Sequence, residues 1–476
     1  MRSKSKIGTT VLFLIIAIVT SGQEHRLENE FENKADSNVR SLNQFFSKGK
    51  FFGHTRSFFM STINEHKLSD YAALGFGAGM GYESARFKNF QFAISGFFIN
   101  NVASSDLTKR DPQTNALSRY EISLFDVENP ANRGDLDRLE ELYLRYHFKK
   151  SSVTFGKQYL NTPFINQQDG RMRPTMENGW WIEINELKKV KINAGWITSI
   201  SPRSTVNWYE IGESIGLYAT GVDEAGNPSA FRGNIHTKGI AIGAIQWSAG
   251  KNLKLQGWNY YVDNIFNTAF LQGDLSIPFK NKSENKFLLG MQFAAQQRVG
   301  NGGNADASKA YLAAGHRSRI FSSRTGAVIR SWELTANYTR IASSGRFLFP
   351  REWGREPFYT FMLRERNEGL GNVHAYVLFA KYEQPKKDWS VTTGAGYYNL
   401  PQSNEYRLNK YGMPSYYHLL MDFRYRFKGF FKGTSLRMIY LYKGNMEEGQ
   451  ANKKVMINRV DMHHFNLILD YWFRTN

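Results

Sequence analysis

Beyond residue 50, apolar and polar residues alternate along the chain with a period of two. In residues 418–427, bulky apolar or aromatic residues occupy every odd position from Leu419 to Phe427, while the even positions include His418 and Asp422. A period of two places successive side chains on opposite faces of a β-strand. About eighteen such segments of roughly ten residues follow one another, separated by turn residues and without a helical period. The pattern predicts a large all-β fold.

The residue types on the two faces favour a membrane barrel over a soluble sandwich of sheets. Large aliphatic residues and many of the 36 Phe, 25 Tyr and 10 Trp residues fill one face, and charged residues fill the other. Charges would be costly in a dry core, but they suit a wet lumen. We therefore expect a transmembrane antiparallel β-barrel of about 18 strands over residues 51–476, with an inward-folded constriction loop.

The beginning of the chain has the features of an export signal. Arg2, Lys4 and Lys6 precede the apolar run 11–19, and small residues follow up to Gly22. This arrangement predicts a cleaved Sec signal peptide over residues 1–22. An uncleaved anchor is the weaker alternative, because the apolar run is well short of about 20 residues. Export, the absence of cysteine and the barrel pattern together predict the outer membrane of a Gram-negative-type bacterium. Residues 23–50 are expected to form a periplasmic lead-in.

Two strands carry more specific information. In residues 72–82, glycines at positions 75, 77, 79 and 81 form one face, which we expect to line the interior where a loop folds in close. Residues 464–473 form an amphipathic final strand, with Phe473 near the chain end. Such a strand resembles the signal that the barrel-assembly machinery reads. The long loops are predicted at 101–138, 160–177, 201–235, 298–325, 343–371, 400–415 and 444–458.

The predicted loop at 160–177 is the main candidate for the constriction. It contains Asp169, Arg171, Arg173 and Glu177 and leads back into Trp180. Folded inward, its prolines would stiffen the backbone, and its two guanidinium groups would match carboxylates. The alternative is an exposed loop with solvated arginines.

This stretch resembles the OprD-type family of substrate-specific porins. The likeness extends to residues 47–56 and to Gly75–Ser84, which reads GFGAGMGYES, and it covers about 51–182 well. The resemblance implies an 18-stranded barrel, a narrow eyelet and a ladder of basic residues that guides a substrate carboxylate. It implies eyelet roles for Arg171, for Arg173 by proximity, and for Arg56 on the first strand. The family loop usually carries an apolar residue where Arg173 stands, so this chain has an extra charge.

A second cluster of charged and aromatic residues occurs in 349–359. Arg351, Arg355 and Tyr359 could form the opposing wall of an eyelet, although a salt-bridged outer loop fits equally well. On the wall strands, Arg145, Arg424 and Arg426 are expected to face the lumen, where arginines lower the barrier for anions. We therefore expect passive diffusion of carboxylate-bearing or amino-acid-like solutes, with a saccharide porin as the alternative.

Other activities have less support in the sequence. An exported chain without a clustered basic helix is not expected to bind nucleic acid. No His-Glu-x-x-His motif occurs, and His463 and His464 point to opposite faces of a strand, so no metal, cofactor or enzyme activity is expected. An outer-membrane phospholipase and a blocked structural barrel remain minor alternatives. The expected partners are small solutes, outer-membrane lipid and the assembly machinery, for a monomer or weak trimer.

Overall fold

The computed structural model describes residues 38–168, 170–279, 282–447 and 453–475. The predicted signal peptide and residues 23–37 of the predicted lead-in lie outside this part of the chain. Residues 38–49 contain a short strand, β1 (Asn38–Val39), and a helix, α2 (Leu42–Ser47). The Ser41 hydroxyl caps this helix by accepting a hydrogen bond from the Gln44 N–H. The wall of the fold begins at Lys50.

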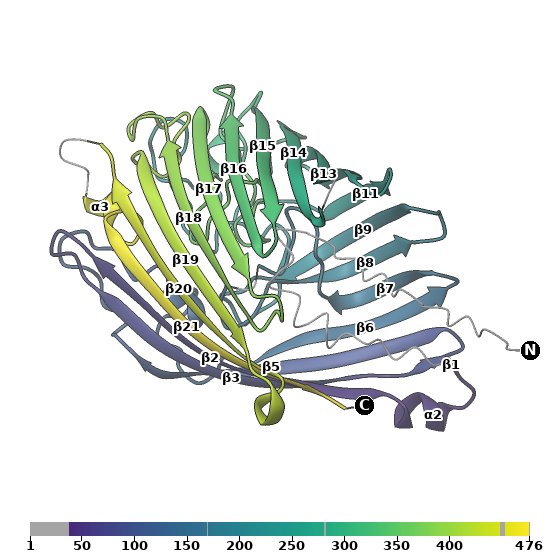
Figure 1. The fold of residues 1–476 in the computed structure, drawn as a ribbon. Coiled ribbons are helices and arrows are strands. Elements are labelled where there is room, and N and C mark those ends of the chain that lie inside the picture. The colour runs from purple at the N-terminus through teal and green to yellow at the C-terminus, as the bar shows by residue number, and fades with distance from the viewer. Residues whose placement is uncertain (1–37, 169, 280–281, 448–452, 476) are drawn as a thin grey trace, which may run out of the picture. The chain divides into compact units, whose positions relative to one another are not determined.

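Eighteen strands form one closed antiparallel β-barrel, as the sequence predicted (Figure 1). Each wall strand pairs with its neighbour in the chain, and the last strand returns to pair with the first, so the sheet has no free edge. The wall strands are β2 (Lys50–Asn64), β3 (Tyr71–Glu83), β5 (Phe90–Ser104), β6 (Arg138–Phe148), β7 (Ser151–Gln158), β8 (Met176–Ile184), β9 (Val190–Ser201), β11 (Ile240–Ser248), β12 (Leu253–Val262), β13 (Phe266–Phe279), β14 (Lys282–Arg298), β15 (Arg317–Ile329), β16 (Trp332–Ile341), β17 (Val373–Glu383), β18 (Trp389–Asn399), β19 (Tyr416–Arg426), β20 (Thr434–Asn445) and β21 (Met462–Arg474).

The seam between β2 and β21 closes the barrel. Its register runs from Phe52 opposite Arg474 to Asn64 opposite Met462. The remaining elements are short: β4 (Arg86–Phe87), β10 (Tyr209–Glu210), α3 (Lys453–Met456), and the 3₁₀ turns η1 (Ile122–Leu124), η2 (Ala307–Lys309) and η3 (Gly429–Phe431). Among the described residues, no helix has both the length and the apolar character needed to cross a membrane.

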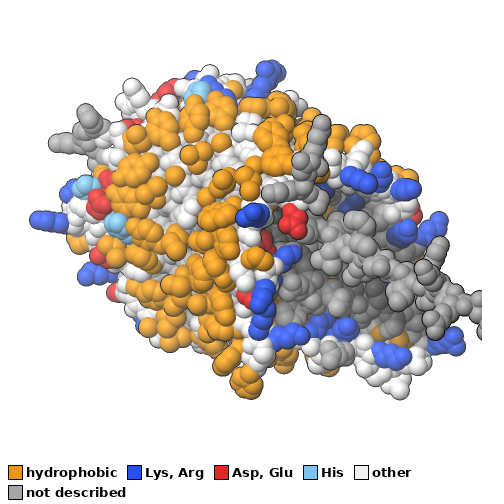
Figure 2. Space-filling view, in the orientation of Figure 1, with side chains coloured by type: hydrophobic (Ala, Val, Ile, Leu, Met, Phe, Trp, Pro, Cys, Tyr) orange, Lys and Arg blue, Asp and Glu red, His pale blue; other side chains and the backbone are white. Residues whose placement is uncertain are grey.

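The alternation along the strands separates an outer face from an inner one. On β19, Leu419 and Met421 are 46% and 48% exposed, whereas His418 and Asp422 are buried. Figure 2 shows the outer face: hydrophobic side chains gather over the strands, and charged ones lie mostly at the margins. An apolar exterior of this kind faces lipid, and the polar side chains point into the lumen.

The connections differ in length at the two ends of the barrel. Turns such as 149–150 and 330–331 join strands at one end, while the long loops lie at the other. Outer-membrane barrels place the short turns in the periplasm and the long loops outside. The loop predicted over 298–325 is shorter than expected, because β15 begins at Arg317. Arg317 and Arg319 are exposed there while Ser318 and Ile320 are buried, and this polar outer face concealed the strand pattern in the sequence.

Candidate functional site

The loop between β7 and β8, residues 159–175, folds into the barrel, and we call it the constriction loop. At one end of the loop, the Phe164 ring packs 5.6 Å from Tyr260 on β12 and 5.5 Å from Phe270 on β13. At the other end, Met172 lies against Gly75 on β3. Strands β3 and β12 are on opposite sides of the closed sheet, so the loop crosses the lumen. The glycine face of β3 lines the interior, and at Gly75 a loop does fold in close, whereas Gly77, Gly79 and Gly81 are approached by residues of the neighbouring strands.

Glycine is required at position 75 because the constriction loop approaches so closely. A Cβ atom there would lie 2.9 Å from Met172 Sδ and 3.3 Å from Phe125 Cε1. We expect Gly75→Leu to displace the constriction loop, with an overpacking cost of about 1–3 kcal/mol, and to raise the single-channel conductance in a planar bilayer. Gly243→Leu on β11 is the matched control, because no atom lies within 4 Å of its Cβ position. Equal conductance in the two variants would contradict this packing role.

Arg173 anchors the constriction loop to the wall through a buried charge network. Its guanidinium donates two hydrogen bonds to the Glu140 carboxylate on β6, and Arg138 Nη2 lies 3.2 Å from Glu140 Oε1. Arg173 also donates to the Tyr159 hydroxyl at 2.8 Å and lies 4.1 Å over the Phe97 ring. Its charge is therefore used inside the protein and is not directed at the lumen.

Arg171 and Arg56 meet on the same side of the lumen. Arg56 on β2 donates from Nε to Asp470 Oδ1 at 2.6 Å and from Nη1 to the Arg171 carbonyl at 2.8 Å. Arg171 donates from its own guanidinium to the Ser123 hydroxyl and to the Gly170 carbonyl. Arg56 thus has an acidic partner and positions the loop backbone, while Arg171 is 5% exposed and is bonded through neutral oxygens.

The loop between β16 and β17, residues 342–372, folds inward and contacts the constriction loop; we call it the arginine loop. The Asn166 side-chain amide donates to the Arg355 carbonyl at 3.0 Å and accepts from the Arg355 N–H at 3.0 Å. The Thr175 hydroxyl donates to the Glu352 carbonyl at 3.2 Å. The two stretches that the sequence singled out independently are therefore in direct contact.

Four arginines gather where these loops meet, and we call them the guanidinium cluster: Arg171, Arg203, Arg364 and Arg366. Arg364 Nη1 lies 3.4 Å from the Gly170 carbonyl, and Arg203 Nη1 donates to Gln168 Oε1 at 2.6 Å. In the described part of the chain, none of the four forms an ion pair with a carboxylate. Arg366 interacts electrostatically with Arg203 and with the buried Glu356, so an acid faces the cluster, and positive charge remains in excess.

The electrostatics of the guanidinium cluster follow from burial and mutual repulsion. Burial and, to a smaller extent, the charge of Arg203 lower the pKa of Arg364 to about 10, so it stays cationic at neutral pH. Glu121 interacts electrostatically with Arg171, but burial raises the pKa of its carboxyl. Glu121 therefore offsets less of the positive charge of Arg171 than a solvent-exposed carboxylate would.

The other predicted residues of the two loops have mainly structural contacts. Arg351 pairs with Glu368 at 2.6 Å and stacks over a tyrosine ring, and the Tyr359 hydroxyl donates to Asp274 at 2.8 Å. Glu177 is fully buried at the start of β8 and accepts the Leu160 N–H at 2.9 Å, so it holds the base of the constriction loop. Asp169 lies outside the described residues.

Arg145, Arg424 and Arg426 lie on inward positions near the short-turn end, away from the guanidinium cluster. Arg145 donates to Thr154 at 2.9 Å, and Arg424 lies 3.1 Å from Asp422. Arg426 is half-buried. The structure thus brings Arg56, Arg171 and Arg173 together. Arg145, Arg424 and Arg426 lie apart from that group.

The sequence interpretation did not single out Arg203, Arg364, Arg366 or Glu140. Arg364 and Arg366 occur in the run RERNEG at the end of the arginine loop, and this dense charge pattern could have indicated them. Arg203 and Glu140 carry no such signal, because their positions depend on how distant segments meet.

The chain contains one run of the hydrolase type, Gly212–Gly216, which reads Gly-x-Ser-x-Gly and which the sequence-based expectation of no enzyme activity did not take into account. Such a run can place a nucleophilic serine on an exposed turn. Here Ser214 is fully buried, accepts the Trp353 indole N–H at 2.8 Å and donates to the Ile211 carbonyl at 2.7 Å. These contacts give it a packing role.

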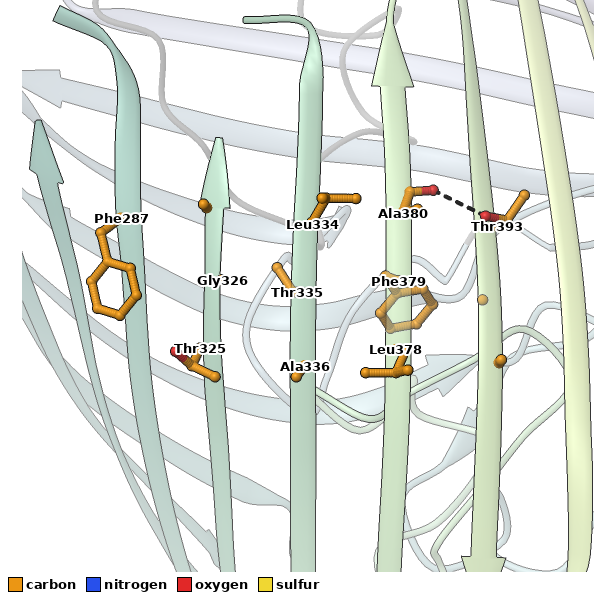
Figure 3. Close-up of a pocket in the computed structure, with 13 residues that line it drawn as sticks. Phe287, Thr325, Gly326, Leu334, Thr335, Ala336, Leu378, Phe379, Ala380 and Thr393 are labelled. Carbon is orange, nitrogen blue, oxygen red and sulfur yellow. Dashed lines mark hydrogen bonds between the residues drawn. The ribbon is translucent and has the colours of Figure 1, made fainter. Parts of the chain in front are cut away.

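A hollow of about 640 Å³ lies on the wall across β15–β18 (Figure 3). Thr325, Ala336, Leu378 and Ala395 pair side by side across it, and all four are exposed outward positions. The hollow therefore opens on the lipid-facing surface of the wall.

Comparisons with known proteins agree with this geometry. Residues 128–362 match the family model described as outer membrane porin, OprD family. Among solved structures, Pseudomonas aeruginosa OpdK with vanillate has a TM-score of 0.69 at 11% identity, covering 90% of this chain and 100% of that chain. P. aeruginosa OccK8 (OprE) has a TM-score of 0.68 at 14% identity, covering 91% and 100%. Acinetobacter baumannii OccAB2 has a TM-score of 0.67 at 12% identity, covering 91% and 100%. No curated protein sequence matched.

Proposed function

Because this chain belongs to the OprD family of outer-membrane porins, we propose that it passes small carboxylate-bearing solutes through a constriction beside the guanidinium cluster. Porins of this kind allow passive diffusion, so the protein has to lower the barrier for its solute without holding it tightly. The guanidinium groups of this cluster attract the carboxylate, and the surrounding loops limit the size of the solute.

The excess of positive charge where the two loops meet is the observation that carries this proposal. Arg56, Arg173 and Arg351 are matched by carboxylates, so they hold the loops in place. Arg364 and Arg366 are half-buried rather than buried, which leaves them within reach of a solute. A guanidinium group in a narrow, partly desolvated passage favours anions and repels cations.

An aromatic side chain accompanies these charges. The half-buried Phe361 ring lies 5.5 Å from the guanidinium of Arg355 and 5.6 Å from that of Arg366. A ring beside two cations suits a solute with an aromatic part and a carboxylate, since the ring offers a stacking surface. The solved OpdK structure contains vanillate, which has both groups. We therefore rank aromatic monocarboxylates above amino acids as solutes for this chain.

The saccharide alternative has less support. Sugar passage needs aromatic rings exposed along the pore as a sliding surface. In the arginine loop, Trp353 is fully buried and Phe349 is 5% exposed, so neither ring is available to a sugar.

Liposome swelling tests the solute class. Proteoliposomes are transferred into isotonic benzoate, arginine or maltose, which represent the aromatic carboxylate, amino-acid and saccharide classes of solute. We expect the fastest swelling in benzoate. In a Phe361→Ala variant, the ratio of swelling rates in benzoate and arginine should fall by a larger factor than the chloride conductance does. Faster swelling in maltose than in benzoate would contradict the proposal and favour the saccharide alternative.

We further propose that the chain is exported through its Sec signal and works as a monomer or weak trimer. The barrel-assembly machinery recognises its last strand, β21. The outward residues of β21, such as Phe465 and Leu467, support recognition by assembly machinery, because they give this terminal strand an apolar outward face.

A further inference from the structure

Four potential metal ligands gather at the outer end of the seam between β2 and β21. Glu65 and His66 follow β2 directly, while Asp461 precedes β21 and His463 is its second residue. The Glu65 N–H donates to the Asp461 carbonyl at 2.9 Å, so the two segments are fixed side by side. Figure 2 shows histidine and acidic side chains together at the margin of the barrel where β20 ends and β21 begins, near α3 in Figure 1.

The ligand atoms have separations typical of groups that share one ion. One donor atom each of Glu65, His66 and Asp461 lies within 4.8 Å of the other two. His66 Nε2 is 2.9 Å from Asp461 Oδ2, and His463 Nε2 is 3.9 Å from Glu65 Oε1. The second distance exceeds a hydrogen bond, but ligands about 2.1 Å from a tetrahedral zinc ion are about 3.4 Å apart. The group that meets the 4.8 Å separation contains Glu65, His66 and Asp461, and the His463 side chain has to rotate toward it to become the fourth ligand.

Each of three candidate ligands is oriented by a further group. The Tyr440 hydroxyl lies 3.0 Å from His463 Nδ1 and so leaves Nε2 for a ligand. The Tyr442 hydroxyl donates to Glu65 Oε1 at 2.9 Å, and the Asn445 N–H donates to Asp461 Oδ1 at 2.7 Å. Outer partners of this kind fix the tautomer and direction of metal ligands.

We infer that Glu65, His66, Asp461 and His463 bind a divalent transition-metal ion, for which Zn²⁺ is the best fit. Two imidazoles and two carboxylates favour Zn²⁺, whereas Mg²⁺ and Ca²⁺ prefer oxygen ligands alone. Binding requires neutral imidazoles, so the proton between His66 and Asp461 moves to His66 Nδ1 or leaves to solvent. The site lies at the protein surface and is separate from the solute path.

Such an ion would join the first and last strands of the barrel. Two of its ligands come from residues 65–66 and two from residues 461–463, so it spans the seam that closes the sheet. Anything that binds the folded state alone stabilises it. We therefore expect zinc to raise the temperature at which the folded barrel unfolds in a detergent gel assay.

The test is a calorimetric titration of the purified full chain in detergent with ZnCl₂, and with CaCl₂ for comparison. We expect one zinc ion per chain and no competing calcium binding. His66→Ala and His463→Ala should each weaken zinc binding by at least about 100-fold, and Tyr440→Phe by about 10-fold. His236→Ala is the matched control, since His236 is an exposed histidine outside the site.

Absence of zinc binding by the wild type would overturn the inference, as would equal binding by the His66→Ala/His463→Ala double variant and the His236→Ala control. Cobalt gives a second readout that does not depend on stability. Co²⁺ in the wild type should show the absorption of a tetrahedral site, and the double variant should show only the octahedral spectrum of the free ion.

Discussion

Glu140→Ala is expected to destabilise the barrel by about 3–5 kcal/mol and to release the constriction loop. The change removes the only carboxylate paired with Arg138 and Arg173 in the described part of the chain. Their side chains are 3% and 7% exposed, so both charges would remain buried without a counter-charge. Denaturant unfolding of the purified protein measures the stability, and planar-bilayer recordings should show a larger and noisier single-channel current.

Asp306→Ala is the matched control, because it breaks the exposed Asp306–Lys309 pair in an outer loop. Surface pairs contribute little, and Asp306 also caps the short turn η2 by accepting the Ser308 N–H, so a loss of at most about 1 kcal/mol is expected there. If Glu140→Ala and Asp306→Ala had the same stability and current, the buried network would not be what holds the constriction loop.

The double variant Arg171→Ala/Arg364→Ala is expected to lose most of the anion preference of the channel. Each guanidinium group removes at least about 1 kcal/mol from the energy of an anion nearby, which corresponds to roughly a fivefold change in permeability ratio. Arg364→Ala should have the larger single effect, since Arg364 is half-buried and Arg171 is buried. The current should also rise, because two large side chains are removed.

Reversal potentials in a salt gradient measure this preference. Arg232→Ala serves as the control, because Arg232 is exposed and pairs with Glu128 in the outer loops. A double variant with the anion preference of the wild type would show that the guanidinium cluster does not select the solute.

The strands of the wall were predictable because membrane barrels obey a strict local rule. Every residue of β19 faces either lipid or lumen, so the sequence alone separates Leu419 from His418. The glycines of β3 indicated a close approach for a similarly local reason, and at Gly75 the approaching residues belong to loops. The start of β15 was missed because its outward residues near the loop end are arginines, which conceal the alternation.

The chemistry of the site was much less predictable. The sequence pattern places Arg171 and Arg173 in one loop, but it does not reveal that Arg173 is paired with Glu140, whereas Arg171 bonds to neutral oxygens among the described residues. That difference depends on which wall strand each side chain meets after the loop has crossed the lumen. The same holds for Arg203 and Arg364, which come from separate loops. Charge excess is therefore a property of the assembled loops and not of any one segment.

The reversal potential of the purified wild-type channel under a potassium chloride gradient tests the central claim most directly. If the guanidinium cluster lies beside an open solute path, the potential will have the sign of chloride selectivity, and added benzoate will block the current at micromolar to millimolar concentration. A cation-selective potential, or a membrane that shows no channel current at all, would contradict it.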